Sequence, residues 1–235
     1  MSGASLHAAV VTVPNANAGT LGNGQSTNPL RSYGTGGNRY QQVYDASQFG
    51  AFSSAESIQS IAFRAKQGVL GSFIGNSVTV SNIIITLSTT SADDTTGLSA
   101  ALNSNVGPNV QTVYSGPLTL TTSTSASTPF GYVINLQTPF TYSKAAGNLL
   151  LDITIPDNAT VTGNGSIGFA QFDTVTDSFP SADGTSSAFA GSGSATVGSN
   201  STTGVVTQFI TSPVPEPASL SLLGAAILIP ALRRR

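Results

Sequence analysis

The side chains that most often carry catalysis are scarce in this chain. His7 is its single histidine and there is no cysteine, so a Ser–His–Asp triad or a thiolate nucleophile has almost nothing to be built from. Glycosidases use a pair of carboxylates, but the two glutamates, Glu56 and Glu216, fall in unrelated segments. Pairs of aspartates remain, although no motif singles one out. We therefore expect a protein that is not an enzyme.

Aspartates in turn-rich segments offer oxygen ligands to a calcium ion. Carboxylates and loop carbonyls are the ligands that this ion prefers. Two groups of acids are close in sequence: Asp93 with Asp94, and Asp173 with Asp177 and Asp183. Neither group has the spacing of an EF-hand loop. We expect solvated loop acids, and neither a metal nor a cofactor.

One stretch with the alternation of a strand carries residues suited to sugars. Tyr40, Gln42 and Tyr44 share one face of this strand, and Tyr33 is near them in sequence. Aromatic rings offer apolar area to a sugar, and an amide bonds its hydroxyls. A glycan-binding face is one interpretation, and packing of the same face in the core is the other. Exposed rings on a concave surface favour the first, and rings buried between sheets favour the second.

The composition indicates a folded protein with an almost uncharged surface. Charged residues make up 8% of the 235 residues, against about 25% in an ordinary soluble protein. Hydrophobic residues reach 39%, which is too many for a typical disordered chain. Ser, Thr, Gly and Asn are abundant, so hydroxyls and amides must solvate the surface. The net charge is −2 and three of the eight basic residues end the chain, so we expect no nucleic-acid partner.

Apolar residues alternate with polar ones over much of the chain, which is the period of half-buried strands. No helical pattern of useful length precedes residue 212. The predicted strands span residues 10–13, 39–45, 61–66, 78–87, 110–114, 117–122, 130–137, 149–155, 166–172 and 204–210, with a bulge or a short break at Asn82. So many strands without intervening helices predict an all-β fold, an antiparallel β-sandwich of jelly-roll type, over residues 10–211.

Three further segments complete the predicted organisation of the chain. Residues 19–38 and 181–203 are rich in Ser, Gly and other small residues, and we expect them to be long surface loops of the same domain. Residues 1–9 lack the basic start and the apolar run of a signal peptide. They are similar to the end of one, with small residues around Ala8 and Ala9. We expect a remnant of a signal peptide that begins upstream of Met1.

The last two dozen residues have a composition of their own. Prolines alternate with other residues over 212–217, so this part is expected to be extended and free of helix. Residues 218–232 are uncharged and mostly aliphatic, and as a helix they span about 22 Å, somewhat short for a bilayer. Arg233, Arg234 and Arg235 follow, and basic residues stay on the cytoplasmic side. A buried core helix is the alternative, but such a helix seldom ends a chain on three arginines.

The order of these parts resembles a known protein-sorting signal. Val214, Pro215, Glu216 and Pro217, the apolar run and the terminal arginines resemble the PEP-CTERM sorting signal, and the resemblance covers residues 213–235. It implies that residues 212–235 are a Pro-Glu-Pro motif, a short transmembrane helix and a basic end. It also implies a Gram-negative-type bacterium that makes exopolysaccharide, and an exosortase, the membrane enzyme thought to remove such tails, as partner.

Together these observations predict an exported structural protein sorted by an exosortase-type system. We expect it at the cell surface or in the extracellular matrix, in association with exopolysaccharide or biofilm. Before the tail is removed, the C-terminal helix is expected to hold an intermediate in the inner membrane. The alternative is a carbohydrate-binding module that acts on the exopolysaccharide.

Overall fold

The computed structural model describes residues 8–31, 37–52, 54–66, 77–121, 130–163 and 171–214. These residues form three antiparallel sheets, and their helical turns are four short 3-10 turns: η1 (Asn15–Asn17), η2 (Ala46–Phe49), η3 (Leu102–Asn105) and η4 (Lys144–Ala146). The all-β prediction is therefore confirmed for this part of the chain. No helix within it is long and apolar enough to cross a membrane, and the predicted membrane helix, residues 218–232, lies outside it.

Two sheets supply most of the strands. The larger has the order β12 (Ser199–Ser201), β11 (Thr185–Ala190), β3 (Asn38–Tyr44), β8 (Asn148–Ile155), β5 (Ser77–Thr90) and β6 (Gln111–Thr121), and β9 (Val161–Gly163) pairs with β5. The four-stranded sheet has the order β1 (Ala9–Val13), β14 (Thr207–Pro213), β4 (Glu56–Phe63) and β7 (Tyr132–Tyr142). A small third sheet is formed by β13 (Gly204–Val205), β10 (Phe172–Val175) and β2 (Gly24–Ser26).

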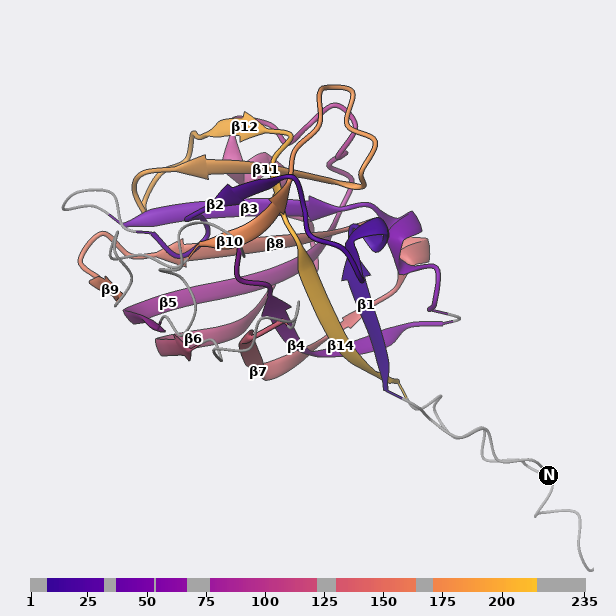
Figure 1. The fold of residues 1–235 in the computed structure, drawn as a ribbon, viewed down its shortest axis with the longest axis horizontal. Coiled ribbons are helices and arrows are strands. Elements are labelled where there is room, and N and C mark those ends of the chain that lie inside the picture. Colours follow the sequence, from indigo (N-terminus) through magenta and orange to yellow (C-terminus); the bar gives the residue numbers. More distant parts are fainter. Residues whose placement is uncertain are drawn as a thin grey trace, which may run out of the picture.

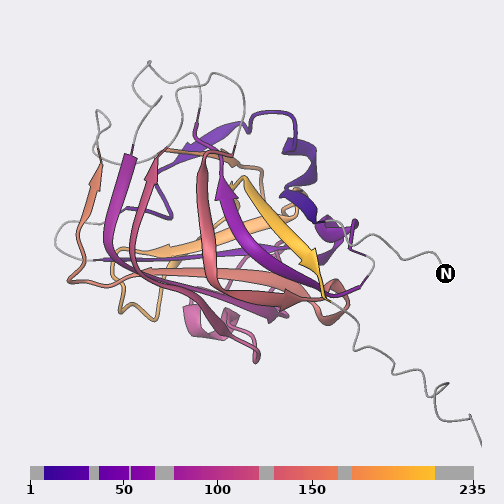
Figure 2. The same cartoon turned by 90° about the horizontal axis from the view of Figure 1, so that it is seen from below.

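The two large sheets run in different directions. In Figure 1 the long strands β3, β8, β5 and β6 lie one below the next, and β1 and β14 run obliquely to them. Figure 2 shows yellow β14 beside its partner β4, with β7 beyond. The first residue of β1, Ala9, pairs with Thr211 near the end of β14. The first strand therefore starts at the same corner of the sheet at which the last strand ends.

One hydrophobic core is built from the inward side chains of both large sheets. Rings from the two sheets meet in it, as where Tyr44 of β3 packs edge-on against Phe209 of β14 with centroids 4.9 Å apart. A smaller cluster lies on the other face of the seven-stranded sheet and consists of Val43, Leu98, Leu102, Leu150 and Ala188. The middle strands of that sheet are thus covered on both faces.

Most of the strands predicted from alternation are present. Residues 39–45 and 149–155 match β3 and β8 to within one residue, and the two strands predicted over 110–122 are one strand, β6. The pairing of β5 with β6 changes register between Val80 and Ile83, which confirms the bulge predicted at Asn82. The strand predicted over 166–172 lies mostly outside the described residues, and β10 begins at Phe172.

The expectation of a long loop over residues 181–203 is wrong in part. Strand β11 lies in this segment and pairs with β3 along its whole length, and β12 pairs with β11. The segment is mostly Ser, Thr, Gly and Ala, so it has no alternation of large apolar residues that would mark a strand. Small side chains suit this position because β11 is buried from Thr185 to Ala188. Likewise β2 lies within the loop predicted over 19–38.

A buried ion pair ties the N-terminal segment to the core. Arg64 and Asp173 are both fully buried, and Nη2 and Nε of Arg64 donate to Oδ2 of Asp173 at 2.8 and 3.0 Å. The guanidinium also donates to the carbonyls of Asn17 and Thr20, and Asp173 accepts from the backbone N–H of Gly22. Because buried charges are stable only when their remaining hydrogen bonds are satisfied, residues 17–22 are held in place by this pair.

We predict that Asp173→Ala lowers the free energy of unfolding by about 3–5 kcal/mol, because it leaves a buried guanidinium without its counter-charge. The matched control is Lys66→Ala. Lys66 contacts the same carboxylate at 3.4 Å, is 15% exposed and also donates to the Gly22 carbonyl. Its loss leaves the pair of Arg64 and Asp173 intact, so we expect a smaller decrease in the free energy of unfolding than for Asp173→Ala. Urea denaturation measures both values. Equal losses in the two variants would contradict the role given to the buried pair.

Candidate functional site

The predicted sugar-binding face points into the core. Tyr40, Gln42 and Tyr44 are almost completely buried, and burial raises the pKa of both phenols well above its ordinary value. The Gln42 amide accepts from the N–H of Val205 at 2.8 Å and donates to its carbonyl at 2.9 Å. Buried rings cannot stack on a sugar, so this geometry favours the other interpretation, packing of the face in the core. Tyr33 lies outside the described residues.

The predicted calcium ligands do not form one site. Asp173 is held in the buried ion pair. Asp177 and Asp183 approach each other through Ser181, whose hydroxyl donates to both carboxylates, and burial raises the pKa of Asp183, with a smaller contribution from the charge of Asp177. Over the described residues there is no group of three or more His, Cys, Asp or Glu that could hold a metal ion.

Asp94, like Asp173, is buried, and both correct the expectation of solvated loop acids. Asp94 is 4% exposed, and burial, together with the nearby charges of Asp45 and Asp93, raises its pKa to about 6. Asp93 is exposed and accepts from the N–H of Thr95, as expected of a loop acid. The buried carboxyl lies in the segment between β5 and β6, which also forms one wall of the cleft described below.

The predicted sorting motif begins where the described chain ends. Strand β14 continues to Pro213, so it includes the first two residues of the segment predicted over 212–235. Val214 follows as the last described residue and is partly exposed. Pro215, Glu216 and Pro217, and with them Arg233, Arg234 and Arg235, lie outside the described residues.

The outer face of β3 and its neighbours forms the floor of a cleft. Arg39 of β3, Asp152 and Thr154 of β8, and Thr86 of β5 line a pocket of about 430 Å³. Its wall is the segment 102–110, which contributes Asn103, Val106 and Val110. A second pocket of about 500 Å³ shares Val106 and is lined by Thr89, Thr90, Ser91, Ser104, Gly107, Pro108, Asn109, Ala146 and Gly147. The two pockets share Val106 as a lining residue.

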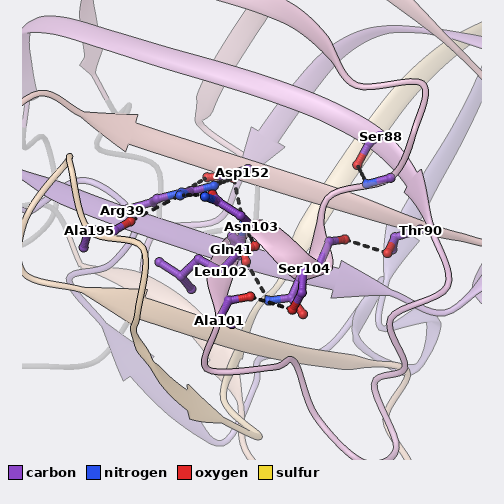
Figure 3. Close-up of polar contacts among 12 residues, drawn as sticks. Arg39, Gln41, Ser88, Thr90, Ala101, Leu102, Asn103, Ser104, Asp152 and Ala195 are labelled. Carbon is purple, nitrogen blue, oxygen red and sulfur yellow. Dashed lines mark hydrogen bonds and ion pairs between the residues drawn. The ribbon is translucent and has the colours of Figure 1, made fainter.

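An ion pair fixes the polar groups of this cleft (Figure 3). Arg39 Nη2 lies 2.7 Å from Asp152 Oδ2, and its Nη1 donates to Asn103 Oδ1 at 2.8 Å and to the Ala195 carbonyl at 3.2 Å. Asp152 also accepts from Gln41 Nε2 at 2.7 Å. It is the only acid among the residues that line the two pockets. The lining therefore lacks a second carboxyl for acid–base catalysis, and it presents hydroxyls, amides and aliphatic groups to a ligand.

The wall of the cleft is held by backbone hydrogen bonds. The N–H of Leu102 donates to the carbonyl of Thr196 at 2.9 Å, and the N–H of Gly198 donates to that of Ala100 at 2.8 Å. The loop around Ala195 is fixed in turn by Asp157. That carboxylate accepts from the hydroxyls and N–H groups of its neighbours, led by the Ser194 hydroxyl, and these bonds hold its pKa well below the usual range. The cleft is therefore formed before any ligand binds.

The sequence contains a signal for this site. Charged residues are rare in this chain, yet Arg39, which is positive, and Asp152, which is negative, lie within two of the predicted strands. In a strand whose other face is apolar, a charge marks the outward face. The pairing of Gln41 with Asp152 across β3 and β8, which brings the two charges together, is not visible in the sequence.

No protein-family model matches this chain, and no curated protein is similar to it in sequence. The tail, the fold and the cleft therefore carry the functional argument.

We predict that Asp94→Asn raises the melting temperature at pH 7.5 and leaves it almost unchanged at pH 4. The pKa of Asp94 is raised from 3.8 to about 6 in the folded protein, so the protonated carboxyl stabilises the fold relative to the ionised one. This stabilisation is fully present below pH 4 and is lost as pH rises through 6. Asparagine does not ionise and avoids this loss. Asp93→Asn removes only one of the charges that raise the Asp94 pKa, so we expect it to raise the melting temperature at pH 7.5 by a smaller amount. A lower melting temperature for Asp94→Asn at pH 7.5 would contradict the prediction.

Proposed function

We propose that this protein is an exported structural protein of the cell surface or extracellular matrix, sorted through residues 212–235 by an exosortase-type membrane enzyme. The tail sequence carries the proposal, because a Pro-Glu-Pro motif, an apolar run and a basic end occur in that order. The position of β14 supports it. This last strand ends at Pro213, so cleavage within residues 214–218 leaves every described strand in the mature protein.

We infer the finer architecture from the strand pairs. The pairs β1–β14, β2–β10, β3–β8, β4–β7 and β5–β6 are nested one inside the next along the chain. Nested antiparallel pairs are what a folded-over ribbon of strands produces, and this supports a sandwich of jelly-roll type. Residues 218–232 are then the membrane helix of the sorting intermediate, with the terminal arginines on the cytoplasmic side.

The surface chemistry of the four-stranded sheet supports a place in a hydrated matrix. Its strands carry a single charged side chain, Glu56, and that side chain is buried and hydrogen-bonded to Thr211. The outward positions are therefore hydroxyls, amides and small aliphatic groups, as at Gln208 and Asn135. Such a surface stays solvated by hydrogen bonds whatever the salt concentration, because it has little charge to screen.

A carbohydrate-binding module is the second candidate function. The observation that favours it is the presence of two pockets that share Val106, one of them lined by Arg39 and Asp152. These pockets, and not the face that carries Tyr40 and Tyr44, are then the candidate sugar-binding site. Both candidates share the same tail, and therefore the same destination.

We predict that the mature protein from its native host ends within residues 214–218 and lacks Arg233, Arg234 and Arg235. In a host without exosortase it is expected to remain membrane-bound and full length, because the extended Pro-Glu-Pro segment is then not cut. Mass spectrometry of the C-terminal peptide makes the distinction. Released native protein that still ends at Arg235 would overturn the sorting assignment.

A further inference from the structure

We propose that the cleft between the strands β3, β8 and β5 and the wall segment 102–110 binds a neutral polysaccharide. The proposal rests on the extracellular setting proposed above, and it names the class of matrix component that the protein contacts. It concerns the two pockets that share Val106.

The charges of the cleft favour an uncharged ligand. The first pocket contains one cation and one anion, Arg39 and Asp152, which lie 2.7 Å apart and cancel. The second pocket is lined by no charged residue. A uronate or sulfate group would meet the Asp152 carboxylate next to a guanidinium that already donates to Asp152, Asn103 and Ala195. Repulsion without a free cationic partner disfavours anionic sugars here.

The remaining lining matches the chemistry of a neutral sugar. A sugar ring has hydroxyls at its edge and C–H groups on its faces. Thr86 and Thr154 line the floor of the first pocket and Asn109 lines the second. The Asn109 amide accepts from the N–H of Thr89 and donates to its hydroxyl, and its second N–H hydrogen can still donate to a ligand. Hydroxyls and amides both donate and accept, as sugar hydroxyls do. Val106 and Val110 give the aliphatic contact, and Val110 is 49% exposed although it is a large apolar residue.

The size and rigidity of the cleft suit a chain of several sugar units. Each pocket has a volume within the range of small-molecule sites, at about 430 and 500 Å³. Each pocket can therefore hold one part of an oligosaccharide, and Val106 lines both. Little ordering is needed on binding, since the wall is already hydrogen-bonded to the loop around Thr196 and preorganised sites lose less entropy. The lining of the two pockets has no aromatic residue, so we expect weak binding, with Kd on the order of 1 mM.

The test titrates the full-length chain in detergent micelles with cellohexaose, laminarihexaose, maltohexaose and, as an anionic probe, an oligomannuronate of equal length. Saturation-transfer NMR and calorimetry report binding. At least one neutral hexasaccharide is expected to bind, and its Kd is expected to change less than about twofold between 50 and 500 mM NaCl, since no net charge is involved.

Two variants locate the site. Val110→Asp is expected to weaken binding at least tenfold, whereas Val133→Asp, at a valine of similar exposure on β7 of the other sheet, is expected to leave it unchanged. Thr154→Val removes a floor hydroxyl and keeps the shape of the side chain, and we expect a three- to tenfold loss. If the far-ultraviolet spectrum shows that Val110→Asp alters the fold, the effect of Thr154→Val on binding alone decides whether the cleft is the binding site.

Three results would overturn the proposal: no binding of any neutral hexasaccharide, binding of the anionic probe alone with a strong dependence on salt, or equal effects of Val110→Asp and Val133→Asp. The sorting assignment is read separately, from the C-terminal peptide of native protein. If the protein binds sugar but native protein keeps Arg235, only the sorting assignment is overturned. If native protein lacks the tail but the protein binds no sugar, only the proposal for the cleft is overturned.

Discussion

Three amide side chains on strand β3 are buried, and they cannot be buried without hydrogen-bond partners. Asn38 donates to the carbonyl of Pro29, Gln41 donates to that of Leu102, and Gln42 bonds both backbone groups of Val205. Each amide thereby fixes a different segment against the same strand. Asn38 Oδ1 is the one exception, since it is buried without a hydrogen-bond partner. The remaining bonds hold the small sheet, the wall of the cleft and the segment at Pro29 against β3.

Side-chain amides also bond backbone groups at two places where the backbones themselves are not paired. Gln137 of β7 accepts from the N–H of Ser115 on β6 and donates to its carbonyl, at 3.0 and 3.1 Å. A side chain thus replaces a ladder step between the edge strands of the two large sheets. Asn23 bonds both backbone groups of Thr176 in the same way. The abundance of amides and the scarcity of charges have one explanation here, since a neutral amide can copy a peptide group at a lower desolvation cost than an ion.

The strands could be predicted from the sequence where large apolar residues alternate, as in β8 and β5, because burial of one face imposes that period. Strand β11 could not, since all of its residues but Phe189 are small and so give no alternation of large apolar side chains. Alternation does not distinguish the two interpretations of the face of β3 that carries Tyr40 and Tyr44, since it is as compatible with a sugar surface as with the core. The burial of both rings and the partners of Gln42 favour the core. The cleft depends on the register of β3 with β8 and on a loop between β5 and β6, and alternation specifies neither.

The position of β14 determines how the domain would respond to a pull on its tail. This strand is hydrogen-bonded on both sides, to β1 and to β4, and it ends at Pro213, just before the tail. A force applied there loads both ladders in shear, so many hydrogen bonds must break together rather than one after another as in unzipping. If the protein is held at its C-terminal end while the surrounding polymer pulls on the domain, the force acts on β14, which resists it because it is paired with strands on both sides.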